Sequence, residues 1–192
     1  MKEQKFILKN MLSKSCIRLV EMACATMEDV TIKKVFLGEV LLAFESHEVD
    51  ELKIINCFEQ LGFEVINTPE SVILERTKIA AVELIYYANN SNSLIRNSDY
   101  ISERVQEPYD RISRIFSQIT GTTLEKYIIL LKIERAKELI YTNEMTLSEI
   151  AYMLGYSSVQ YLSNQFKKIT GFTVSAYRNL KNPLRTPLEQ LL

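Results

Sequence analysis

Apolar and polar positions follow two different periods along the chain. Up to about residue 67, short alternating runs typical of strands are interrupted by two amphipathic helical stretches. From about residue 69 onward, apolar residues recur at helical spacing, with polar loops and glycines between the helical stretches. The pattern therefore predicts an α+β protein, with a small mixed domain followed by an all-α domain.

The first region is expected to contain four strands and two helices. The strands are predicted at 5–11, 31–37, 39–45 and 63–67, and the helices at 14–27 and 47–61. Gly38 lies between the two middle strands, which indicates a hairpin, and Gly62 ends the second helix. The order β-α-β-β-α-β predicts a ferredoxin-like domain over residues 1–68, with an antiparallel sheet and two helices on one face.

A helix is predicted to follow at Pro69 and to end in the polar loop 89–93. Its apolar positions cover more than one stripe: Ile73, Ile79, Ala80, Leu84 and Tyr87. Such a helix can belong to the core of the helical domain, join the two domains or pair with a partner subunit. Residues 69–92 are accordingly assigned to a connecting helix and loop.

Residues 146–171 have the pattern of a helix-turn-helix unit. Thr146 and Glu149 have capping-box spacing, and Gly155 suits the sharp turn. Ser157 is expected to cap a second helix that runs to about Thr170. That helix would bury Tyr161, Leu162, Phe166 and Ile169. It would leave on its outer face Val159, Gln160, Ser163, Asn164 and Lys167.

A repeat indicates a second such unit. The segment 112–127, ISRIFSQITGTTLEKY, matches 162–177, LSNQFKKITGFTVSAY, without a gap. Two copies of one unit imply two recognition helices. Thr122 and Glu125 predict the start of a linking helix from about Thr123 to Tyr141, about 28 Å long at 1.5 Å per residue. One turn of B-DNA is about 34 Å, so this length suits successive major grooves.

Residues 93–181 resemble the DNA-binding domain of the AraC/XylS family of bacterial transcription regulators. The resemblance is carried by KIERAKELI, LSEIAYMLGYSS and YLSNQFKKITGFTVSAYR. The first unit departs from it, because Pro108 stands in place of the turn glycine and the turn is one residue shorter. The resemblance implies a double helix-turn-helix domain over 93–182. It also implies base-contacting positions, which fall on Asp110, Ser113, Arg114, Val159, Gln160, Ser163 and Asn164.

The chemistry of these side chains suits base edges to different degrees. Arg114 can bond two acceptors of guanine, and Gln160 and Asn164 can each pair with adenine through two bonds. Asp110 would suit only a cytosine amino group, and the alternative is a carboxylate favoured at a helix start. Lys167 either contacts a phosphate or keeps the helix end solvated. Glu134 is expected to make surface ion pairs with its helix neighbours.

The N-terminal region resembles the small heavy-metal-associated domain. The metal loop MxCxxC of that domain corresponds here to Met11, Ser13 and Cys16, so one thiolate has become a hydroxyl. The expectation is that a monomer binds no metal, with Cys16 as the candidate for a metal shared between subunits or for oxidant sensing. Cys24 and Cys57 occupy helical positions typical of a core, where a free thiol behaves as a small hydrophobe.

Composition and charge agree with a soluble regulator. The chain is 47% hydrophobic, with net charge −1, and its three cysteines fit a reducing cytoplasm. Residues 94–182 carry 12 Lys and Arg against 9 Asp and Glu, whereas residues 1–93 carry 10 against 14. The basic excess therefore coincides with the helix-turn-helix region. Neither a transmembrane candidate nor a signal peptide is evident.

The sequence thus predicts a sequence-specific regulator that binds double-stranded DNA in two successive major grooves. No catalytic constellation surrounds the lone His47, so an enzyme is not expected, and no cofactor is implied. RNA polymerase and a second copy of the chain are left open as partners, as are a small-molecule or metal signal. Residues 183–192 are predicted to be a tail. The alternative function is a metal-trafficking or protein-interaction module with degenerate helix-turn-helix units.

Overall fold

The structure is a computed structural model that describes residues 2–45, 51–87 and 97–192. These residues fall into two compact units, 1–79 and 80–192, and the division lies within one helix, α3 (Pro69–Val82). Each unit has a hydrophobic core of its own.

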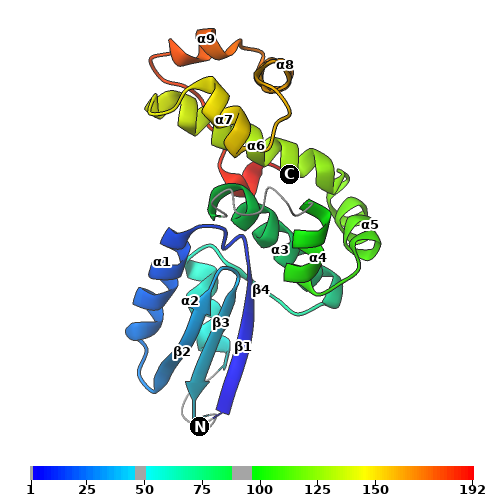
Figure 1. The fold of residues 1–192 in the computed structure, drawn as a ribbon. Helices are drawn as coiled ribbons and strands as arrows, with labels where there is room; N and C mark the ends of the chain where they lie inside the picture. Colours follow the sequence, from blue (N-terminus) through cyan, green and yellow to red (C-terminus); the bar gives the residue numbers. More distant parts are fainter. Residues whose placement is uncertain (1, 46–50, 88–96) are drawn as a thin grey trace. The chain divides into compact units, whose positions relative to one another are not determined.

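The first unit contains a four-stranded antiparallel sheet, drawn in blue to cyan in Figure 1. Its strands are β1 (Lys2–Lys9), β2 (Val30–Phe36), β3 (Glu39–Phe44) and β4 (Glu64–Ile66), in the spatial order β2-β3-β1-β4. Helix α1 (Lys14–Ala25) lies between β1 and β2, and α2 (Glu51–Gln60) lies between β3 and β4. The predicted order of strands and helices is therefore the order observed, although α1 ends two residues before the predicted Met27.

Both helices pack on one face of this sheet. Alternate residues of β1 and β3, such as Phe6, Leu8 and Leu42, point toward that face because successive strand side chains alternate. Val20 of α1 and Phe58 of α2 meet them in the core. The prediction that Cys24 is a core residue is confirmed, whereas Cys57 is only half-buried and lies outside the cluster of buried residues.

Helix α3 holds the loop after β1 through two buried charged side chains. A Glu75 carboxylate oxygen accepts a 2.6 Å hydrogen bond from the Asn10 backbone N–H, and the Lys78 ammonium lies 3.4 Å from the other oxygen. At the β2–β3 turn, Gly38 has φ +69°, and a Cβ there would lie 2.2 Å from Ile79 Cδ1. Glycine is required because both the backbone conformation and the close approach of α3 exclude a side chain.

The helix predicted to continue beyond α3 changes its hydrogen bonding. Residues Glu83–Tyr87 form a π-helical segment, and Tyr87 is partly exposed. The remainder of the predicted connecting loop and the lone His47 lie outside the described residues.

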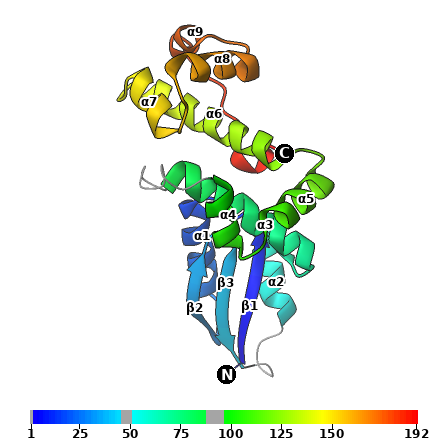
Figure 2. The ribbon, with the colours of Figure 1, turned by 45° about the vertical axis from the view of Figure 1, so that its right-hand side comes forward.

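The second unit consists of helices connected by short turns, coloured green to red in Figure 1. In chain order they are α4 (Asn97–Val105), α5 (Tyr109–Thr120), α6 (Leu124–Thr142), α7 (Leu147–Met153), α8 (Val159–Thr170), α9 (Val174–Arg178) and the short 3-10 helix η2 (Leu188–Gln190). Helix α6 runs between the α4–α5 pair and the α7–α8 pair, as the turned view in Figure 2 also shows. The long linking helix predicted from the sequence is therefore present.

The repeated sequence folds twice into the same local structure. Phe116 of α5 packs against Tyr127 with ring centroids 5.3 Å apart, and Phe166 of α8 packs against Tyr177 at the same separation. Thr120 caps its own helix end by donating to the Phe116 carbonyl, and Thr170 donates to the Phe166 carbonyl in the same way. The two copies therefore share their core contacts and their helix ends.

Two predictions about burial in this unit are wrong. Tyr161 and Ile169, predicted in the core of α8, have side chains that are 53% and 36% exposed, because Leu162 and Phe166 alone fill the buried stripe. Glu134, predicted at the surface, is 3% exposed and pairs with Lys137, which is 9% exposed. The C-terminal tail contributes to this burial, since the Thr186 backbone N–H donates to Glu134 at 3.1 Å.

Candidate nucleic-acid interface

The second helix-turn-helix unit is formed by α7 and α8. Thr146 accepts a hydrogen bond from the Glu149 backbone N–H, and the Glu149 carboxylate accepts one from the Thr146 N–H, which confirms the predicted capping box. Gly155 takes φ +67° at the turn. Ser158, rather than the predicted Ser157, caps α8 by accepting from the Tyr161 N–H at 3.1 Å. The turn therefore contains one residue more than expected before the helix begins.

The first helix-turn-helix unit, α4 and α5, reaches a similar geometry without a glycine. Gln106 takes the left-handed conformation, φ 62°, directly after α4. Pro108 precedes α5, where its fixed φ suits a helix start and its missing N–H leaves no donor unsatisfied. Three residues separate α4 from α5, against five between α7 and α8. The turn of this unit is therefore shorter, as predicted, although the helix bounds differ by two residues and not by the one expected.

Helix α5 presents the three predicted positions on its outer side. Asp110 and Arg114 are exposed and Ser113 is half-buried, while the opposite side buries Ile112 and Phe116. Among the described residues, no hydrogen bond or ion pair engages the Arg114 guanidinium. Arg111, by contrast, is held by the Glu107 carboxylate at 2.9 Å. Arg114 is thus the arginine of α5 that is available to a ligand.

Helix α8 presents the remaining predicted positions. Gln160, Asn164 and Lys167 are exposed, and Val159 and Ser163 are half-buried. The Gln160 side-chain NH2 donates to the Asn164 carbonyl oxygen at 2.9 Å. This contact fixes the two amides relative to each other, and it leaves the Gln160 oxygen as an acceptor and the Asn164 NH2 as a donor.

Helix α6 separates α5 from the α7–α8 pair. It has 19 residues, which corresponds to about 28 Å at 1.5 Å per residue. Thr123 caps it by accepting from the Lys126 N–H, so the predicted cap at Thr122 is displaced by one residue. Its buried residues contact both units, with Tyr127 against α5 and Ile133 in the core that includes Leu162.

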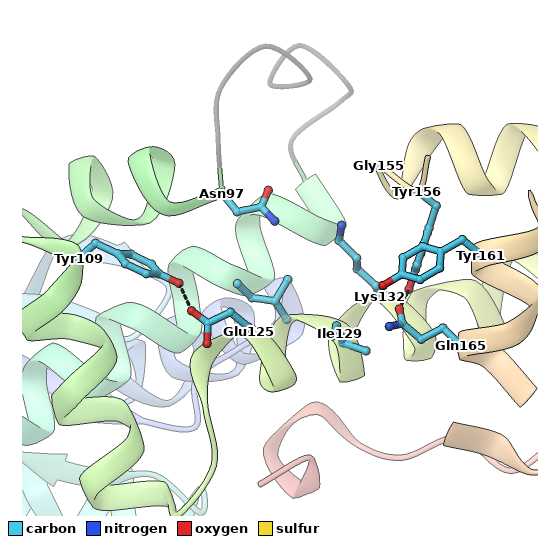
Figure 3. A pocket seen from close by; sticks show the side chains of 10 residues that line it. Asn97, Tyr109, Glu125, Ile129, Lys132, Gly155, Tyr156, Tyr161 and Gln165 are labelled. Carbon is cyan, nitrogen blue, oxygen red and sulfur yellow. Dashed lines mark hydrogen bonds between the residues drawn. The ribbon is translucent and has the colours of Figure 1, made fainter. Parts of the chain in front are cut away.

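A pocket of about 260 Å³ lies along α6 between α5 and α8, shown in Figure 3. At one end the Tyr109 hydroxyl donates to the Glu125 carboxylate at 2.6 Å, and this bond lowers the pKa of Glu125. At the other end the Lys132 ammonium lies 5.3 Å from the centroid of the Tyr156 ring. Burial lowers the pKa of Lys132. The pocket therefore has an acidic end and a basic end.

The loop that was compared with a metal-binding loop has a structural role at the start of α1. Ser13 is the N-cap of this helix, and its hydroxyl oxygen lies 3.1 Å from the Cys16 sulfur. Met11 is fully buried. Within residues 2–45, 51–87 and 97–192, no group of three or more His, Cys, Asp and Glu side chains is arranged to hold a metal ion.

The helix-turn-helix region is similar in sequence to known proteins. Residues 101–180 match a family described as "Helix-turn-helix domain". The xylose operon regulatory protein of Escherichia coli (strain K12) is 25% identical over 132 residues, which cover 65% of this chain and 34% of that protein. The HTH-type transcriptional activator RhaR of Mannheimia succiniciproducens is 26% identical over 125 residues, covering 64% of this chain and 45% of RhaR.

Among solved structures, the C-terminal domain of AraT, a response regulator from Geobacillus stearothermophilus, is 23% identical with a TM-score of 0.47, covering 58% of this chain and 87% of that one. The chain spans about a third of the length of the xylose operon regulatory protein. The sequence matches confirm the class of domain that was predicted. The C-terminal region is a helix-turn-helix domain, and the two relatives named above are regulators of transcription.

Two residues beside this interface were missed by the sequence reasoning. From the sequence, Lys132 is noted only as the first residue of the segment KIERAKELI, and Tyr161 is predicted to lie in the core. One signal was present: Glu125, Ile128, Ile129 and Lys132 follow a helical stripe of α6, all of which lines the pocket. The exposed aromatic ring of Tyr161 had no such signal, because its position fits an amphipathic helix equally well.

No helix among the described residues is long and apolar enough to cross a membrane.

Proposed function

We propose that this protein is a sequence-specific regulator of transcription that binds double-stranded DNA in two successive major grooves. The observation that carries the proposal is the pair of recognition helices, α5 and α8, which expose polar side chains from the two ends of the 19-residue helix α6. The length of α6, about 28 Å, is of the order of one helical turn of DNA, about 34 Å. A 25–26% identity to regulators over most of this chain supports the same reading.

In this proposal the two recognition helices read different bases. Arg114 is exposed and has no hydrogen bond or ion pair with the residues that the structure describes, and a guanidinium suits the two major-groove acceptors of guanine. The Gln160 oxygen and the Asn164 NH2 together present one acceptor and one donor, which complement the N6 amino group and N7 of adenine. Ser113, Val159 and Ser163 lie beside them and would contact base edges or methyl groups. Lys167 would contact a phosphate.

Asp110 has a different expected role. Its carboxylate lies in the first turn of α5, where the helix dipole favours a negative charge. Near the duplex it would be repelled by phosphates unless it accepts from a cytosine amino group. We assign it primarily to the helix start, with cytosine as the one base that it would tolerate nearby.

We further propose that the N-terminal sheet and its two helices, α1 and α2, form a ferredoxin-like domain. This domain would sense a signal or mediate assembly, including a homodimer. The sheet order β2-β3-β1-β4, with α1 and α2 on one face, supports that fold. The proposed limits are 1–68 for this domain, 69–92 for the connection, 93–182 for the DNA-binding domain and 183–192 for the tail. With Ser13 used as a helix cap, this domain is not proposed to bind a metal as a monomer.

The experiment that tests the function is selection of the purified protein against a pool of random duplexes, at two salt concentrations, followed by sequencing. Enrichment of two sequence blocks about one helical turn apart is expected. Enrichment of only one block would show that the first helix-turn-helix unit, α4 and α5, does not read bases. Retention that is lost with salt and enriches no sequence would contradict specific recognition and favour an interaction module.

A further inference from the structure

Among the described residues, the cation at the basic end of the α6 pocket has no anionic partner. Within the described part of the chain, no carboxylate pairs with the Lys132 ammonium, which instead faces the Tyr156 ring at 5.3 Å. Other buried cations of this protein are paired, as Lys137 is with Glu134 and Lys78 with Glu75. A partly buried ammonium without a counter-charge is unfavourable, and an anion in the pocket would relieve this cost.

The surroundings of Lys132 hold its ammonium toward the open pocket. The Tyr156 ring is itself fixed, because its hydroxyl donates to the Gln165 side chain at 2.9 Å and its ring packs edge-on against Tyr161 at 5.8 Å. Gly155 has no side chain in front of Lys132, and a Cβ there would lie 3.6 Å from the ammonium nitrogen. In Figure 3 the Lys132 and Tyr161 side chains both extend into the pocket.

The pocket lies next to both recognition surfaces. On α8, its lining residues Tyr161 and Gln165 directly follow Gln160 and Asn164. On α5, Tyr109 directly precedes Asp110. A duplex read by both helices at once must pass its sugar-phosphate backbone between the two major grooves, and α6 bridges that interval. The carboxylate of Glu125 is seven residues from Lys132, about 10 Å along the helix axis, so it does not occupy the basic end.

We infer that the basic end of this pocket is a phosphate site, in which the Lys132 ammonium and the Tyr161 hydroxyl bind a backbone phosphate of the DNA between the two major-groove contacts. This inference rests on the proposed function. A phosphate oxygen would replace the missing counter-charge of Lys132 and accept a hydrogen bond from the exposed Tyr161. Such a contact would set the register of the two recognition helices on the duplex without reading a base.

The test uses the full-length protein and the duplex obtained by selection. The variant Lys132→Met keeps the aliphatic stem and removes the charge, and Tyr161→Phe removes only the hydroxyl. Lys126→Met, at an exposed position on the same helix, is the control for net charge. Lys132→Met is expected to weaken binding about tenfold on every sequence. It should also make the slope of log K against log salt shallower by about 0.9, whereas the slope of Lys126→Met remains that of the wild type.

A second measurement locates the phosphate. Duplexes carrying one neutral methylphosphonate at each position between the two sequence blocks are compared with the unmodified duplex. One or two positions are expected to weaken wild-type binding and to leave Lys132→Met binding unchanged. Tyr161→Phe, which should fold even if Lys132→Met does not, is expected to lose part of the effect at the same positions.

The outcomes separate this inference from the proposed function. If the wild type selects a two-block motif but Lys132→Met and Tyr161→Phe keep its salt slope and its methylphosphonate profile, the phosphate site is refuted and the regulator stands. If the wild type selects no motif, the proposed function itself fails. If inorganic phosphate, exchanged for chloride at constant ionic strength, stabilises the wild type but not Lys132→Met while the DNA salt slope is the same, the site belongs to a free phosphate and the DNA assignment is wrong.

Discussion

Gln106 and Gly155 end the first helices of the two helix-turn-helix units with nearly the same left-handed backbone conformation, φ 62° and 67°. The unit that lacks a glycine therefore forms the same kind of helix end as the unit that has one. A side chain in this conformation costs about 1–2 kcal/mol, which is partly offset because glycine loses more backbone freedom on folding.

This relationship predicts opposite effects of two substitutions on stability. Gln106→Gly is expected to raise the free energy of unfolding by about 0.5 kcal/mol, and Gly155→Ala to lower it by about 1 kcal/mol. The methyl group that Gly155→Ala adds would meet Lys132 only at an ordinary 3.6 Å, so the effect should come from the backbone. Urea unfolding measures both. A stabilising Gly155→Ala would show that the turn is not held in this conformation.

Base reading by the two recognition helices predicts separable losses of specificity. Arg114→Ala should abolish discrimination in one block of the selected sequence, and Asn164→Ala in the other, each with a loss of about 1–3 kcal/mol of binding free energy. Neither change should alter thermal unfolding, because both side chains are exposed. Arg111→Ala is the matched control on α5, since Glu107 already engages that arginine. Equal losses for Arg111→Ala and Arg114→Ala would contradict the assignment.

The buried pair Glu134–Lys137 predicts strong coupling between two positions of α6. Lys137→Met leaves the Glu134 carboxylate buried with the Thr186 N–H as its remaining partner, and it is expected to destabilise the protein by about 3–5 kcal/mol. The double variant Glu134→Leu with Lys137→Met should recover most of that loss, since apolar replacements of a buried pair are often neutral. Urea unfolding of the two single variants and the double variant gives the coupling energy. Additive losses would argue against a buried pair.

The hydrogen bond from Tyr109 to Glu125 predicts a pH dependence. It lowers the pKa of Glu125 from 4.5, so the carboxylate form stabilises the folded state. That contribution is fully present above about pH 4.5 and is lost as the pH falls through the lowered folded-state pKa. Tyr109→Phe should bring the NMR titration of Glu125 back toward 4.5 and flatten the acid limb of stability. An unchanged Glu125 titration in Tyr109→Phe would exclude this bond in solution.

The three cysteines of the compact unit 1–79 should differ in their reactivity toward an alkylating reagent. Burial, together with the neighbouring Cys57, raises the pKa of Cys24 to about 11, and burial also raises the pKa of Cys57. Cys16 is half-buried beside Ser13. With iodoacetamide near neutral pH, Cys16 is expected to react first and Cys24 only at the rate of unfolding, because the attacking species is the thiolate. Mass spectrometry of the native and urea-unfolded protein makes the comparison, and early labelling of Cys24 would show that α1 opens locally.

Local sequence determined the elements and the second helix-turn-helix unit. The capping box of Thr146 and Glu149, the turn at Gly155 and the internal repeat are short-range signals, because each depends on residues within a few turns of one helix. The same holds for the order of strands and helices in the first unit, where the alternation of apolar residues sets the period. Cap positions were displaced by one residue at Ser158 and Thr123, since adjacent hydroxyl residues compete for the same role.

Tertiary packing alone decided which polar groups are buried and which aromatic rings are not. The sequence pattern predicts Glu134 at the surface. In the folded chain its carboxylate accepts a hydrogen bond from the Thr186 N–H of the tail, fifty-two positions later. Tyr161 fits a buried stripe in α8, but Leu162 and Phe166 already fill the space beside α6, so its ring lies outward. Lys132 is a candidate phosphate-binding residue only because the folded chain places Tyr156 and Gly155 beside its ammonium group. These outcomes depend on contacts between distant segments, whose geometry no local pattern contains.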